Sequence, residues 1–159
     1  MQTNIKERSM SSVITVRELN KKCGECTACC SGHLYGEAHG HKFFKGRPCF
    51  FVTKAGCSIY EDRPDVPCKS FKCGYLTFPF FPEWMRPDQS GVLATHGIFK
   101  AGDETKPYLQ ISEYNKPMSA LSLWWFIEKY RDGQLPNLLI NIGGFHHRLG
   151  TEEFLRANL

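Results

Sequence analysis

Eight cysteines are the residues of this chain whose type and spacing suggest chemistry, and all lie between Cys23 and Cys73 of its 159 residues. The first four form the run Cys23-Gly-Glu-Cys26-Thr-Ala-Cys29-Cys30. Two residues between cysteines let a tight turn present both sulfurs to one ion, and tetrahedral Zn–S bonds of about 2.3 Å suit this spacing. We therefore expect metal binding, and zinc is the metal that we favour. The expected ligands are Cys23, Cys26, Cys29, Cys30, Cys49, Cys57, Cys68 and Cys73.

Three chemistries compete for these cysteines. Two four-cysteine zinc sites would use all eight thiolates. Iron–sulfur ligation is the alternative, because Cys23, Cys26 and Cys29 reproduce the first three positions of the bacterial ferredoxin run. His33 stands where that run has its fourth cysteine, so a remote cysteine such as Cys68 would have to complete the cluster. Four disulfides are the third interpretation.

Cys29 and Cys30 are adjacent, and neighbouring side chains diverge, so one tetrahedral ion does not suit both. We expect them to serve two different sites, or one of them to stay free. Nitrogen ligands can also come from the loop histidines His33, His39 and His41. With eight thiolates at hand, we expect these three histidines to be solvated instead.

The cysteine segment resembles the YkgJ-like cysteine-cluster family, which is described as zinc- or iron-chelating domains. The resemblance rests on the run Cys23–Cys30, on Cys57-Ser58-Ile59-Tyr60, and on Arg63-Pro64 followed by Cys68, and it covers about residues 21–75. It implies metal chelation. Three residues rather than two separate Pro64 from Cys68, and Lys69 replaces the usual arginine. A distant relationship to flagellin lysine N-methylase implies an enzymatic role somewhere in the family.

The formal net charge of +4 is concentrated in the cysteine segment. Residues 21–73 hold nine Lys and Arg against five Asp and Glu, and the remainder holds eleven of each. Each zinc ion bound by four thiolates carries a net charge of −2, so two such sites would cancel this excess. The pI of 8.6 is below the value above 9 typical of nucleic-acid-binding domains. We therefore expect a metal ion, rather than nucleic acid, as the partner, and an unidentified protein partner remains open.

The N-terminal residues contain no secretory signal, and no apolar run is long enough to span a membrane. We therefore expect a cytoplasmic protein without a membrane partner. Stable disulfides are rare in the reducing cytosol, which argues against the disulfide interpretation. Common enzyme motifs, including phosphate-binding loops and the serine-hydrolase elbow, are missing from the sequence. Whether the protein is an enzyme stays open: we expect a structural metal site, and the alternative is an iron–sulfur protein in redox or methyl-transfer chemistry.

The part of the chain that contains the cysteines lacks regular secondary-structure patterns, whereas the part after residue 82 has them. We predict an N-terminal arm over 1–20, including a short strand at Val13–Val16, a cysteine module over 21–82 without sustained periodicity, and a small α+β part over 83–159. The expected fold is α+β, with the module packed on a small antiparallel sheet and one main helix. Metal binding would organise the module, because its backbone polar groups lack regular pairing.

Within the α+β part, β-rich runs over 91–100 and 107–114 predict a hairpin with a loop over 101–106. Asn115 is the expected cap of the main helix and Gly133 its stop. We expect a strand over Leu138–Ile142, a polar loop at His146-His147, and a last helix opened by Thr151.

Aromatic residues give three further expectations. Residues 78–84 should pack the cysteine module onto the α+β part. Of Trp124 and Trp125, one should point inward and the other only partly so. His96 should be half-buried in its strand.

Overall fold

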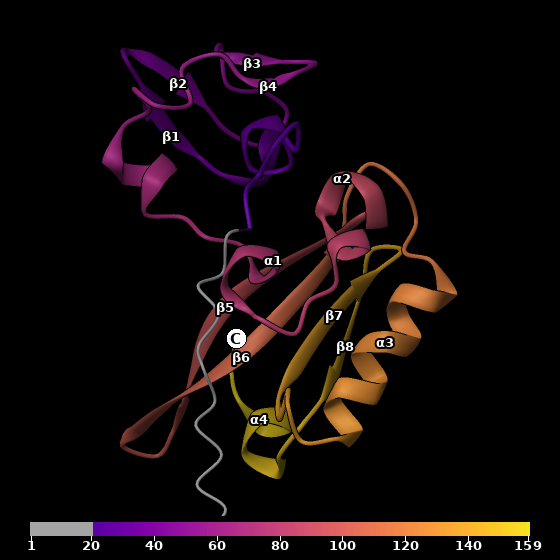
Figure 1. Cartoon of the computed structure of the whole chain (residues 1–159). Helices are drawn as coiled ribbons and strands as arrows, with labels where there is room; N and C mark the ends of the chain where they lie inside the picture. The colour runs from indigo at the N-terminus through magenta and orange to yellow at the C-terminus, as the bar shows by residue number, and fades with distance from the viewer. Residues whose placement is uncertain (1–20) are drawn as a thin grey trace, which may run out of the picture.

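The computed structural model describes residues 21–159, so the predicted arm over 1–20 and its strand at Val13–Val16 lie outside the described residues. A four-stranded sheet in the order β5-β6-β7-β8 forms the regular part of the fold (Figure 1). Its strands are β5 (Val92–Ala101), β6 (Glu104–Glu113), β7 (Leu138–Ile142) and β8 (Phe145–Leu149). The α+β class is confirmed.

The sheet is mixed, whereas the sequence predicted an antiparallel one. β5 pairs with β6 and β7 with β8 in antiparallel hairpins, but β6 and β7 run parallel, with Leu109 opposite Leu138. The cause is the connection, because helix α3 (Ala120–Arg131) carries the chain back to the starting end of the sheet between these two strands.

Two loops of the prediction are strand in the structure. The β5–β6 ladder continues to Ala101 opposite Glu104, so the turn is shorter than the predicted loop over 101–106. The predicted polar loop at His146-His147 is part of β8, which pairs with β7 after the turn at Gly143-Gly144. A polar sequence can form this strand because β8 is an edge strand with an exposed face.

Helix α3 begins at a different cap from the predicted Asn115. The Ser119 side chain accepts a hydrogen bond from the backbone N–H of Ser122 at 3.0 Å, which satisfies one of the free donors of the first turn. Asn115 lies in the left-handed region instead, with φ of 57°. Gly133, with φ of 73°, follows the last turn as predicted.

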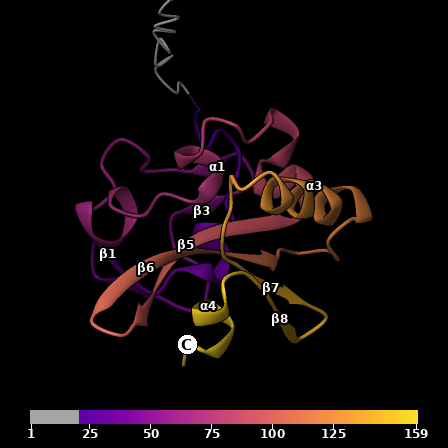
Figure 2. The ribbon, with the colours of Figure 1, turned by 90° about the horizontal axis from the view of Figure 1, so that it is seen from below.

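Helices cover both faces of the sheet (Figure 2). Phe126 of α3 is fully buried against one face, together with Ile111 and Leu138. On the other face, Phe154 of α4 (Glu152–Arg156) packs on Phe99 and Leu139. Trp125 is half-buried and Trp124 is 57% exposed, so the two differ as expected but neither is fully buried.

The cysteine module lies beyond one end of the sheet (Figure 1). It contains two small hairpins, β1 (Gly36–Ala38) with β2 (His41–Phe43) and β3 (Val52–Thr53) with β4 (Gly56–Cys57). Two irregular helical turns, η1 (Cys29–His33) and η2 (Asp65–Lys69), complete it. Short pieces lead from the module to the sheet: α1 (Gly74–Thr77), η3 (Glu83–Met85) and α2 (Pro87–Ser90).

Three phenylalanines of the aromatic segment over 78–84, Phe78, Phe80 and Phe81, pack in or against the main core, whereas Trp84 is 37% exposed. Phe81 is 3% exposed and packs edge-on against Phe126. The Lys21 ammonium, at the start of the described chain, donates hydrogen bonds to the carbonyl oxygens of Phe78 and Phe81. This segment therefore ties the beginning of the module to the sheet. Over residues 21–159 the structure contains no helix with the length and apolarity needed to cross a membrane.

Candidate metal centre

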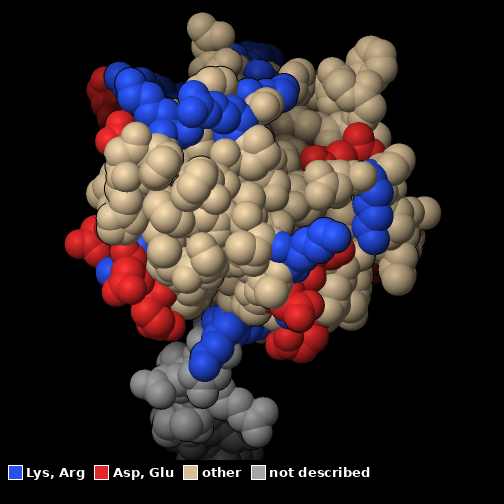
Figure 3. All heavy atoms as spheres, turned by 90° about the horizontal axis from the view of Figure 1, so that it is seen from above, with Lys and Arg blue, Asp and Glu red and all other residues tan. Residues whose placement is uncertain are grey.

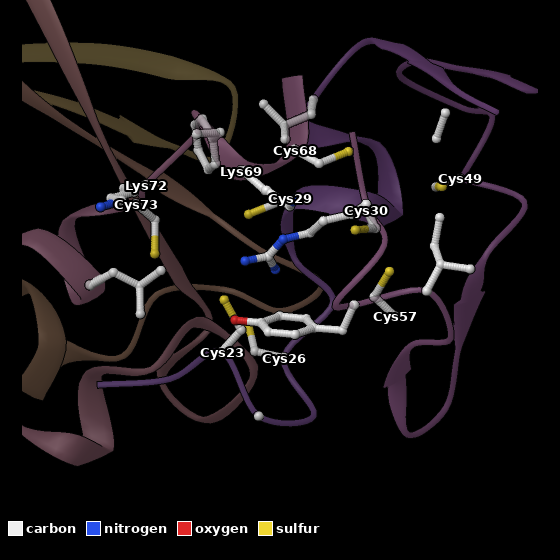
Figure 4. A pocket seen from close by; sticks show the side chains of 18 of the residues that line it. Cys23, Cys26, Cys29, Cys30, Cys49, Cys57, Cys68, Lys69, Lys72 and Cys73 are labelled. Atoms are coloured by element: carbon white, nitrogen blue, oxygen red, sulfur yellow. The ribbon is translucent and has the colours of Figure 1, made fainter. Parts of the chain in front are cut away.

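All eight cysteine side chains line one cavity of about 260 Å³ (Figure 4). They are free thiols, and none forms a disulfide. Cys49 and Cys73 are buried and the other six are half-buried. Residues that are up to 50 positions apart in the sequence therefore share one lining. The spacing of the cysteines suggested two local groups but did not predict a single enclosed space.

The first cysteine turn is a tight one. The Cys26 N–H donates to the Cys23 carbonyl oxygen at 3.0 Å, and Gly24 supplies a φ of 55°. Gly56, at the tip of the β3–β4 hairpin, approaches this turn closely. A Cβ added at Gly56 would lie 3.1 Å from the Gly24 carbonyl oxygen, and its φ of 115° also favours glycine. The hairpin can thereby bring Cys57 to the cavity.

Backbone hydrogen bonds fix the remaining cysteines. The Cys49 N–H donates to the Cys30 carbonyl oxygen at 2.9 Å, so these two positions are held together. Cys57 pairs with Val52 across the β3–β4 ladder. Cys68 lies in η2, and Cys73 precedes α1 and accepts hydrogen bonds at its carbonyl oxygen from the next turn.

The thiols fall into two sets on opposite sides of the cavity (Figure 4). Cys29 and Cys30, although adjacent in the chain, belong to different sets. We call the set beside the sheet the inner set; its members are Cys23, Cys26, Cys29 and Cys73. The set within the β1–β4 region is the outer set; its members are Cys30, Cys49, Cys57 and Cys68.

Electrostatic neighbours of Cys29 lie mainly in the inner set. Burial is the main cause that raises the pKa of this thiol, because the charged form loses its hydration. The negative charge of Cys73 is the next cause, and Cys30, Cys23 and Cys26 follow. Three of these four neighbours are inner-set thiols.

Cys30 has the outer set as its neighbours. Burial raises the pKa of Cys30 to about 12, and the thiols that add to this rise are, in order, Cys57, Cys49 and Cys68. The inner-set Cys23 has the smallest effect of the four. Without a cation in the cavity these groups are therefore neutral thiols at pH 7. A bound divalent cation reverses this preference, because it stabilises the thiolate directly.

The two sets also belong to different hydrophobic clusters. Cys73 is part of the main core under the sheet, and Cys26 packs against it. Cys49 is part of a small separate cluster around the β1–β2 hairpin, against which Cys30 and Cys68 pack. Each set therefore has one fully buried cysteine, with 5% exposure at Cys73 and 6% at Cys49.

Arg63 is the cavity residue that cysteine spacing did not reveal. Its guanidinium lies 3.7 Å from the ring centroid of Tyr60, and both residues line the cavity. Burial disfavours its charge, but Tyr60, Cys23 and Cys57 favour it and its pKa is raised overall. Its Nε is, within residues 21–159, the one buried side-chain nitrogen or oxygen without a hydrogen-bond partner. The motif around Tyr60 and Arg63 was the signal in the sequence that marked these positions.

The histidines lie away from the cavity. None of the six, all within the described residues, is among its lining residues. His33 packs edge-on against Tyr114, and His41 stacks on Phe50 at 4.2 Å between ring centroids. His96 is exposed rather than half-buried, and it contacts the Thr77 hydroxyl at 2.7 Å. Nitrogen ligation by His33, His39 or His41 would require these rings to leave their present places.

The donor chemistry of the cavity fits a thiophilic metal, but the sulfur positions are open. Over residues 21–159, no three His, Cys, Asp or Glu side chains are arranged closely enough to hold a single ion. A tetrahedral zinc ion with Zn–S bonds of about 2.3 Å places its sulfurs about 3.8 Å apart. The thiols of a set would therefore have to move inward from the cavity walls to close around one ion.

Charged side chains on the module face do not form one basic surface. Figure 3 shows Lys and Arg in separate groups toward the margins, with Asp and Glu among them and a broad uncharged centre. This agrees with the alternation of basic and acidic residues in the sequence.

No protein-family model matches this chain, and neither a curated protein nor a solved structure shows significant similarity to it.

Proposed function

We propose that this protein is a metal-binding cysteine-cluster protein in which thiolates hold zinc as a structural metal. One observation carries the proposal: eight free thiols from five separate segments line one cavity. Buried cysteines in an ordinary core would be distributed among apolar neighbours. Here the neighbours that raise the pKa of Cys29 and Cys30, after burial, are other cysteines, so ionising these thiols together is costly unless a cation compensates the charge.

The metal would supply the folding energy that the module lacks. Between Cys23 and Cys73 the only ladders described are two hairpins with strands of two or three residues. Ligands that are deprotonated and drawn together by zinc can fix such a segment, as in other small zinc-dependent folds. The thiol state of all eight cysteines also supports our proposal of a reducing, cytoplasmic location.

An iron–sulfur centre is the second candidate. The observation that favours it is the open spacing of the thiols around an enclosed space, since a cluster is larger than a single ion. The chemistry supplied by such a centre would be electron transfer, or support of redox or methyl-transfer reactions. The residues themselves would ligate the centre and, through Arg63, balance part of its charge.

Elemental analysis and a visible spectrum of anaerobically purified full-length protein test the proposal. We expect zinc in stoichiometric amount and no colour. Iron with acid-labile sulfide, and a visible band that bleaches on reduction, would contradict the zinc proposal and support the iron–sulfur centre. Absence of any bound metal, with all eight thiols titratable in denaturant, would contradict both.

A further inference from the structure

We propose that the eight thiols form two separate four-thiolate metal centres, divided at the peptide bond between Cys29 and Cys30. This inference rests on the proposed metal-binding function and assigns its ligands. The inner centre would use Cys23, Cys26, Cys29 and Cys73. The outer centre would use Cys30, Cys49, Cys57 and Cys68.

The first argument is the direction of adjacent side chains. Cys29 and Cys30 lie in different sets across the cavity (Figure 4). The Cys29 side chain lies on the same side as Cys73, and the Cys30 side chain lies on the same side as Cys57 (Figure 4). A single shared centre would instead need these consecutive side chains to point at the same place.

The second argument is that different parts of the fold hold the two sets. The inner set belongs to the first cysteine turn and to the residue before α1, and Cys26 and Cys73 pack in the main core. The outer set belongs to the β3–β4 hairpin, to η2, and to the backbone pair of Cys30 with Cys49. The two sets share η1, which carries both Cys29 and Cys30, but their other ligands come from different elements. Each set can therefore close on its own ion mainly through movement of its own elements.

The third argument is Arg63, which lines the cavity together with the thiols of both sets. Its guanidinium lies 3.7 Å from the ring centroid of Tyr60, a second lining residue. Two centres with four thiolates each would carry a charge of −2 apiece and repel each other. A guanidinium in the same cavity, with its buried Nε unpaired among the described residues, can donate to sulfurs of both.

Paired substitutions separate two centres from one. Single changes leave three ligands and can retain metal, so each variant removes two thiols. One variant combines Cys26→Ser with Cys73→Ser, and a second combines Cys57→Ser with Cys68→Ser. A third, crossed variant combines Cys26→Ser with Cys68→Ser. Ser70→Ala, at an exposed hydroxyl near Cys68, is the control.

Metal per chain, by mass spectrometry of the anaerobic protein, is the readout. We expect each within-set pair to lose half of the wild-type metal, zinc or iron. The crossed pair leaves three thiols in each centre, so it should keep more metal than either within-set pair. The control should keep the full amount. Equal losses in all three paired variants would overturn the division. Metal-free wild-type protein would instead contradict the proposed function itself, before any variant is compared.

X-ray absorption of the wild-type zinc form keeps the test independent of variant folding. Two separate centres predict four sulfurs per zinc at about 2.3 Å and no short zinc–zinc distance. A short zinc–zinc distance, as in a thiolate-bridged cluster, would overturn the division even if every cysteine variant failed to fold.

Discussion

Arg63 keeps a full positive charge inside a cavity whose lining is dominated by thiols. The charge is compatible with burial because its guanidinium stacks on Tyr60 and because nearby thiols become anionic when they ligate metal. Removing the Arg63 guanidinium would leave less positive charge to compensate the negative charge of the bound metal centres. The effect should appear in metal retention rather than in the fold of the sheet.

Arg63→Gln should therefore lower the affinity for metal by about 10- to 100-fold, the usual effect of losing a residue that supports metal ligands. Competition with a chromogenic chelator measures the change. Arg47→Gln makes the same charge change at an exposed position outside the cavity and should leave the affinity unaltered. Equal effects of the two substitutions would show that net charge alone is responsible.

Asp88 is a second residue with a specific electrostatic role. Arg86 donates two hydrogen bonds to its carboxylate, at 2.7 and 2.8 Å, and these hold the pKa of Asp88 below its ordinary value of 3.8. Arg86 also lies against the first cysteine turn, since a Cβ at Gly24 would be 3.1 Å from its Nη1. The ion pair of Arg86 and Asp88 therefore holds α2 against the first cysteine turn.

The stability from this pair should depend on pH in one direction. Because the folded pKa of Asp88 is lowered, the stabilisation is fully present above pH 4 and is lost as the pH falls through the folded value. Urea unfolding should thus separate wild type from Asp88→Asn at pH 7, and the difference should shrink below pH 4. A difference that grows on acidification would refute this account.

At the scale of elements, α3 shows how a helix divides its two faces between core and solvent. Phe126 is 0% exposed and contacts Phe81 and Trp125, whereas Leu121 is 65% exposed. Burial of a large aromatic side chain on the sheet holds the crossover that makes β6 and β7 parallel. Loss of that side chain should leave a cavity that the surrounding residues fill only in part.

We expect Phe126→Ala to lower the free energy of unfolding by about 3–5 kcal/mol. Leu121→Ala, an apolar truncation on the exposed face of the same helix, should change it by less than about 0.5 kcal/mol. Urea titrations of both variants, followed by tryptophan fluorescence, measure the two values. Similar losses in both would mean that the exposed face of α3 is covered in solution.

Local sequence signals identified most elements but not their ends or neighbours. The short apolar run over Leu138–Ile142 and the stop at Gly133 predicted a strand and a helix end correctly. The cap of α3 was wrong because Asn115 and Ser119 are both capping types, and only tertiary packing selects between them. β8 was missed because an exposed edge strand needs no apolar pattern. The parallel β6–β7 pair depends on chain connection, which periodicity does not encode.

The candidate site was predictable in its chemistry and not in its geometry. Cysteine type and spacing predicted eight thiol ligands, and the structure brings all eight to one cavity. The division between Cys29 and Cys30 was one of two alternatives, and only the folded chain assigns each to a set. Arg63 could not be assigned a role from spacing, because its position depends on η2 and Tyr60 in three dimensions.

At the scale of the whole molecule, two parts with different sources of order meet at the segment over 78–84. The sheet has long ladders, an apolar core and two covering helices, whereas the module has short hairpins around a thiol cavity. Metal-coupled folding should therefore affect one part much more than the other.

Hydrogen exchange before and after metal removal tests this difference. With metal withdrawn by a chelator, amides over residues 23–73 should exchange rapidly, while amides in β5, β6 and β7 keep most of their protection. Returning the metal should restore the slow exchange of the module. Protection that is unchanged throughout the chain, or lost equally from the sheet, would disagree with a structural metal confined to the module.

The raised pKa values of the buried thiols affect how these thiols react in the metal-free protein. Oxidants and other disulfides react with thiolates, and neutral thiols react slowly. In a metal-free chain that keeps this fold, burial keeps Cys29 and Cys30 protonated at neutral pH, so these two sulfurs react slowly with oxidants. Wherever the module stays folded without metal, the cavity that gathers the ligands thus also slows the oxidation of Cys29 and Cys30 and their cross-linking with a wrong partner.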